Sequence, residues 1–163
     1  MLNSKIEKIL NEQVEKEGYS SNLYMSMASW AEVNGYAGIA AWLYMQSDEE
    51  RQHMLKLIGF INERGGHAII PQFKEPPAVQ KSVINMFEEV LRHEQYISQS
   101  INDIVALCME EKDYTTHNWI QWFVTEQIEE EANSQQILDK LSMLNESSLY
   151  VFDRDIMSLR GNN

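Results

Sequence analysis

The helix-breaking residues of this chain are concentrated in one segment, and this constrains its fold more than any other feature. All three prolines and the only Gly-Gly pair fall within residues 65–81. Residues of this kind mark turns and loops. The segment is therefore expected to be one long connection between two halves of the chain.

The apolar residues on both sides of this connection recur every three or four positions, as they do on one face of a helix. The periodic stretches are residues 4–33, 38–64, 82–111 and 114–142. Short links make the first two, and the last two, antiparallel neighbours, and a 17-residue crossover can run the length of a bundle. We predict an all-α four-helix bundle of two antiparallel hairpins with a short fifth helix at residues 147–160, in a single domain spanning residues 1–163.

Composition and charge exclude several classes of protein. The chain has one Cys, no apolar signal segment in its first twenty residues, and no apolar stretch near the roughly 20 residues that span a bilayer. Its formal net charge of −12 repels nucleic-acid phosphates and favours cations. We therefore expect a cytoplasmic protein that binds neither nucleic acid nor a membrane.

Each predicted helix carries an acidic residue in the middle of its apolar face: Glu17, Glu50, Glu94 and Glu130. Glu17 and Glu50 are 33 residues apart, as are Glu94 and Gln127, which indicates two hairpins of equal build and acids at one level. Buried carboxylates are costly unless they are paired or bind metal. Because no Lys or Arg lies on these faces, a metal site is the economical explanation.

The residue types narrow the choice of metal. Glu50 and His53 form Glu-x-x-His, the i, i+3 spacing of carboxylate-bridged di-iron or di-manganese sites in bundles. This motif is common by chance, and it gains weight here only because the other three acids share its level. Oxygen-rich ligation with one imidazole suits Fe(II) or Mn(II), whereas structural zinc calls for more Cys or His. Iron is the expected metal.

A second acidic group consists of Glu126, Glu129 and Glu130, to which Glu49 can add its carboxylate. Adjacent acids on a helix normally face water. The alternative is a third, weaker cation site beside the pair. The sequence leaves both interpretations open.

The residues that carry this chemistry resemble the ferritins, and specifically the bacterial non-haem ferritins, from Lys5 to about Leu159. The resemblance rests on Glu17 followed seven residues later by Tyr24, and on three segments: DEERQHM at 48–54, HEQ at 93–95 and QWFVTEQIEEE at 121–131.

The resemblance implies a ferritin-like bundle and specific roles for the site residues. One iron site is expected at Glu17, Glu50 and His53, and a second at Glu50, Glu94 and Glu130, with Glu50 bridging and Gln127 close by. A third iron site is expected at Glu49, Glu126, Glu129 and Glu130. Tyr24 and Trp122 resemble redox-active aromatics beside the centre, with ordinary core packing as the alternative.

The implied function is iron storage with ferroxidase activity. Fe(II) is oxidised to Fe(III) by dioxygen or peroxide and deposited as a ferric mineral inside a hollow shell of 24 copies. Haem is not expected. The haem-ligating Met of bacterioferritins is replaced here by Gln52, and their second Glu-x-x-His by Gln127-x-x-Glu130.

Two alternatives use the same bundle. A rubrerythrin-like soluble di-iron oxidase or peroxidase would carry an additional Cys-rich electron-transfer module, whereas this chain has only Cys108, which is expected in the core. A purely structural shell subunit that stores iron without oxidising it would have lost the buried acids, and none is missing here.

Overall fold

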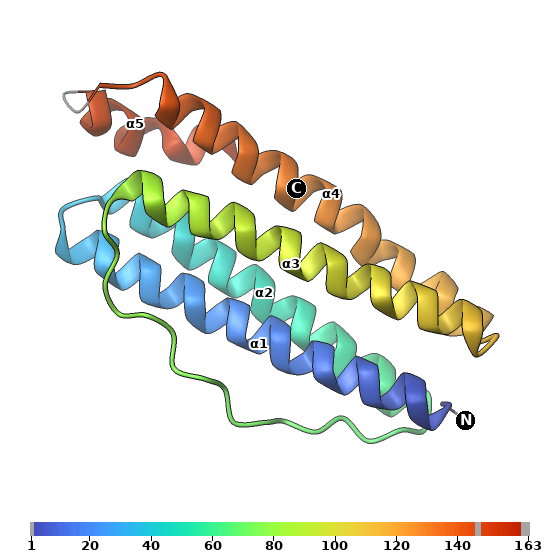
Figure 1. Ribbon diagram of the computed structural model, residues 1–163. Helices are drawn as coiled ribbons and strands as arrows, with labels where there is room; N and C mark the ends of the chain where they lie inside the picture. Colours follow the sequence, from blue (N-terminus) through green and yellow to red (C-terminus); the bar gives the residue numbers. More distant parts are fainter. Residues whose placement is uncertain (1, 146–147, 161–163) are drawn as a thin grey trace.

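The computed structural model describes residues 2–145 and 148–160, and the regular elements in these ranges are all helical. Four long helices lie side by side, and the crossover runs alongside α1 from one end of the bundle to the other (Figure 1). The predicted ferritin-like bundle is thereby confirmed, with long-helix boundaries within one residue of expectation. The elements are α1 (Ser4–Val33), α2 (Ala37–Glu63), α3 (Val83–Glu110), α4 (Tyr114–Ser142), α5 (Leu149–Asp155) and the 3-10 helix η2 (Ile156–Leu159).

Local sequence explains where the long helices begin and end. The side chains of Asn3, Ser82 and Asp113 each accept a hydrogen bond from a backbone N–H in the first turn of α1, α3 and α4, respectively. Gly35 and Gly65 follow α1 and α2 with φ of +84° and +77°, a left-handed conformation that glycine adopts without strain. Short-range signals therefore define both hairpins.

The apolar core consists of two clusters, and every long helix contributes to both of them. On α1, Leu10 belongs to one cluster and Ala28 to the other, and Glu17 lies between them. The same change of cluster occurs around Glu50 on α2, around Glu94 on α3 and around Gln127 and Glu130 on α4. A polar layer therefore crosses the bundle at one level, as the 33-residue spacings predicted.

Near the end of α3 the buried row runs through Ile97, Ile101, Ile104 and Cys108, and Val105 beside it is only half-buried. These steps of four and three residues keep the row on one face of the helix. Cys108 packs in the core of α3 as expected.

The C-terminal segment differs from a continuous fifth helix. The predicted range was 147–160, but the segment forms α5 followed by η2, and Ser147 lies outside the described residues. Phe152 and Ile156 are buried in the core. Asp153 Oδ1 accepts a hydrogen bond of 2.8 Å from the backbone N–H of Ile39, which caps the start of α2. This segment is therefore docked on the bundle.

No helix within residues 2–145 and 148–160 is both long and apolar enough to cross a membrane.

Candidate metal centre

The polar layer places four carboxylates in the interior. Glu17, Glu50 and Glu94 are each 1% exposed, and Glu130 is 6% exposed. Among the buried residues that the structure describes there is no Lys or Arg. The layer thus lacks the positive charge that would normally offset buried carboxylates.

Three side chains of this layer converge on one point. Glu17, Glu50 and His53 each offer a ligand atom, and these atoms lie within 4.8 Å of one another. Glu17 Oε2, Glu50 Oε1 and His53 Nδ1 are buried without a hydrogen-bond partner within the described chain. Buried polar atoms are almost always paired. A close triad in which every member keeps one unpartnered buried atom fits a divalent cation held by two carboxylates and an imidazole.

Glu94 and Glu130 lie beside this triad, but hydrogen-bond donors engage them. The Tyr24 hydroxyl donates to Glu94 Oε1, and Gln127 Nε2 donates to Glu94 Oε2 over 3.1 Å. Gln46 Nε2 donates to Glu130 Oε2 over 2.9 Å. The structure thus brings the three ligands of the first predicted iron site within ligand distance of one another. Glu94 and Glu130, predicted for the second site, lie in the same layer with donors on their carboxylates.

Burial raises the pKa of all four carboxyl groups in the layer. The pKa values of Glu17 and Glu50 lie well above the ordinary value because of desolvation first and repulsion between carboxylates second. Burial and the nearby Glu94 raise the pKa of Glu130 to about 8. Burial therefore favours the protonated form of these carboxyls, and a metal ion that binds to them must displace protons.

Two glutamines orient the ligands, and sequence reasoning missed them. Gln13 Nε2 donates to Glu17 Oε1 over 2.7 Å, while the Ser100 hydroxyl donates to Gln13 Oε1 over 2.5 Å. This pairing fixes the amide and leaves Glu17 Oε2 without a hydrogen-bond partner. Gln46 likewise orients Glu130. The i, i+4 spacing of Gln13 and Glu17 was an available signal. Gln46 has the same spacing to Glu50, but its amide donates to Glu130 on another helix, which spacing does not indicate.

The second acidic group adjoins the metal centre. A cavity of about 20 Å³ is lined by Trp42, Gln46, Glu49, Glu126, Glu129, Glu130, Asn133 and Arg160. Glu126 Oε1 lies 3.9 Å from His53 Nε2. Burial raises the pKa of Glu126. The acids at 49, 126, 129 and 130 therefore line one small, partly open cavity beside the triad, and Arg160, which the sequence analysis did not single out, lines it too.

The two aromatic residues singled out in the sequence flank the centre from different helices. Tyr24 is fully buried on α1 and hydrogen-bonded to Glu94. Trp122 on α4 is 39% exposed, and its ring centroid lies 5.4 Å from that of His53. The ammonium group of Lys56 lies 4.1 Å from the centroid of the Trp122 ring. Both aromatic rings are thus close enough to influence the ligands.

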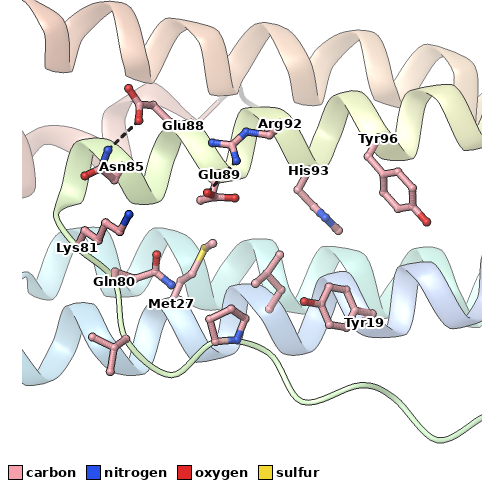
Figure 2. Close-up of a pocket in the computed structure, with 13 residues that line it drawn as sticks. Tyr19, Met27, Gln80, Lys81, Asn85, Glu88, Glu89, Arg92, His93 and Tyr96 are labelled. Atoms are coloured by element: carbon pink, nitrogen blue, oxygen red, sulfur yellow. Dashed lines mark hydrogen bonds and ion pairs between the residues drawn. The ribbon is translucent and has the colours of Figure 1, made fainter.

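A larger cavity of about 700 Å³ lies between α1, α3 and the crossover (Figure 2). Several of its polar side chains are engaged along α3: Arg92 pairs with Glu89, and Asn85 donates to Glu88. None of the orphaned buried atoms of the described chain lines it. The triad therefore remains the better candidate site.

Comparisons with known proteins agree with this geometry. The ferritin-like domain family matches residues 7–144. A bacterial non-heme ferritin of Campylobacter jejuni is 41% identical over 161 residues, which cover 98% of this chain and 96% of that protein. A bacterial non-heme ferritin of Escherichia coli O157:H7 is 37% identical over 98% of both chains.

Solved structures extend the match to three dimensions. An open-pore ferritin from the archaeon Archaeoglobus fulgidus superimposes with a TM-score of 0.94 at 37% identity, over 98% of each chain. A humanized archaeal ferritin gives a TM-score of 0.95 at 36% identity, over 100% of this chain and 99% of that one. Fold, buried ligand set and full-length similarity together show that the chain belongs to the ferritin family.

Proposed function

We propose that this protein is a cytoplasmic iron-storage ferritin with ferroxidase activity, formed by a single domain spanning residues 1–163. The observation that carries the proposal is the set of three buried, orphaned ligand atoms on Glu17, Glu50 and His53. Its relatives are named as bacterial non-heme ferritins and its structural neighbours as ferritins, which supports iron as the metal.

Fe(II) is the substrate in this proposal. One ion binds to Glu17, Glu50 and His53. A second ion binds between Glu50, Glu94 and Glu130. The hydrogen bonds that Tyr24, Gln127 and Gln46 donate to these carboxylates break first. The protons held by the raised-pKa carboxyls leave as the ions enter. Each Fe(II) then gives one electron to dioxygen or peroxide, and Fe(III) moves on to the mineral.

The surrounding residues prepare the site for this exchange. Gln13 holds one oxygen of Glu17 and leaves the other free. Tyr24 and Trp122 lie beside the ligands, where they can supply a further electron when the oxidant needs more than the irons provide. Glu49, Glu126 and Glu129 line the adjoining cavity, which we assign to a third iron ion.

The proposal is tested by adding Fe(II) aerobically to the wild-type protein and to Glu50→Ala. Because Glu50 contributes to both iron positions, its loss is expected to reduce the initial rate at least about 100-fold, comparable to losing an essential catalytic group. The ultraviolet absorbance of Fe(III) measures the rate. Glu63→Ala, an exposed acid on the same helix, serves as the control and should behave as wild type. Equal rates for Glu50→Ala and wild type would refute the proposal.

A further inference from the structure

Arg160 is a cation in a place where the sequence predicted only acids. Its side chain is 15% exposed, and its Nη2 lies 2.6 Å from Glu49 Oε2. Its Nη1 donates to Gln46 Oε1 over 2.8 Å and to the Trp42 carbonyl over 3.3 Å. The guanidinium carbon lies 5.7 Å from the centroid of the Trp42 ring. The end of η2 is thus held on the bundle by several contacts from one side chain.

Arg160 acts on two groups that we place on the iron path. It binds Glu49 directly. It also fixes the amide of Gln46, because an oxygen that accepts from Arg160 leaves the Gln46 Nε2 to donate to Glu130 over 2.9 Å. One guanidinium therefore reaches a proposed third-site ligand by an ion pair and a proposed di-iron ligand through one amide.

The cavity beside these groups is small. Its volume of about 20 Å³ suffices for one water-sized occupant, which needs about 10–15 Å³. A guanidinium remains charged at any accessible pH. A divalent cation entering the cavity therefore meets both the repulsion of Arg160 and a Glu49 oxygen that is already engaged.

We propose that Arg160 is a tethered counter-cation, which a divalent metal ion displaces from Glu49 when it binds in the cavity beside Glu126 and Glu129. Arg160 is a positioning residue in this scheme and contacts no iron. Metal occupancy of the third site and docking of the C-terminal segment are thereby coupled, and the coupling is reciprocal. The inference deepens the proposed function and rests on it.

The first test measures Zn(II) binding to the fully assembled protein by calorimetry. Zn(II) is redox-inert, so binding is separated from oxidation. In Arg160→Gln, the weaker class of Zn(II) sites is expected to bind about tenfold more tightly than in wild type, within the range of coupled sites. Arg160→Lys keeps the positive charge, and its Zn(II) affinity at the weaker sites should lie between those of wild type and Arg160→Gln. Arg154→Gln is the matched control, because Arg154 is exposed on α5 and pairs with Asp155.

The second test measures hydrogen exchange of residues 149–160 in the wild-type protein. Zn(II) is expected to accelerate it, because metal binding releases Arg160. Unchanged or slower exchange overturns the inference, as does equal weak-site affinity in Arg160→Gln and wild type, or the lack of any weaker class of sites. Tight Zn(II) binding at Glu17, Glu50 and His53 is a separate readout. Its absence in wild type counts against the proposed function. If tight binding is present, a negative result in the tests above counts against the Arg160 inference alone.

Discussion

At the scale of single residues, the centre is defined by which atoms lack a partner. Gln13 satisfies one oxygen of Glu17 and leaves the other orphaned. Glu94 and Glu130, at the same level, have donors on their carboxylates. The two halves of the site should therefore fill in order, because the first cation breaks no hydrogen bond to these ligand atoms and the second must displace several.

The raised pKa values predict proton release on metal binding. A carboxyl whose pKa lies above the solution pH is protonated before binding and ionised afterwards. At pH 6.5 Glu130, with a pKa of about 8, should contribute close to one proton, and at pH 8.5 only a minor fraction of one. We expect the number of protons released per Zn(II) bound, measured by pH-stat titration, to fall between these pH values. The same number of protons released at both pH values would contradict the raised pKa of Glu130.

At the scale of elements, the docking of α5 depends on a close approach to α2. A Cβ on Gly38 would lie 1.8 Å from the carbonyl oxygen of Asp153. This oxygen is a backbone atom, so it cannot move away by a change of rotamer as a flexible side chain can. The close contact between Gly38 and Asp153 thus allows Phe152 to reach the core and Arg160 to reach Glu49.

Gly38→Ala is expected to undock this segment. Overpacking of this kind costs about 1–3 kcal/mol, so the melting temperature should fall and trypsin should cleave at Arg154 and Arg160 faster than in wild type. Gly59→Ala is the matched control on the same helix, since a Cβ there meets nothing within 4 Å, and helix propensity favours Ala by up to about 1 kcal/mol. Equal cleavage of both variants would show that the close contact does not hold α5.

At the scale of the whole molecule, the surface carries large apolar side chains that a lone chain would leave in water. Val33, Val79 and Tyr150 are 85%, 77% and 75% exposed. Exposed apolar groups of this size mark interaction surfaces where they are contiguous. Membership of the ferritin family implies a homo-oligomeric shell that can cover such side chains, and we propose that it holds 24 copies.

Assembly is tested by native mass spectrometry together with iron analysis. A shell of 24 chains of 19.0 kDa has a mass of about 460 kDa. We expect this species, after aerobic loading, to hold many more irons per chain than the two or three that the ligands can bind. A small oligomer with two irons per chain would instead favour the rubrerythrin-like alternative.

The helices and their polar layer were predictable because helical periodicity is a local property. The helix breakers and the spacing of apolar positions placed the long helices within one residue, and equal 33-residue spacings put Glu17, Glu50 and Glu94 at one level. Contacts between helices depend on axial rotation and rotamer, which periodicity does not encode. Tertiary structure alone decided which ligand atoms are orphaned, that Gln46 turns toward Glu130, and that Arg160 reaches Glu49 from 111 residues away.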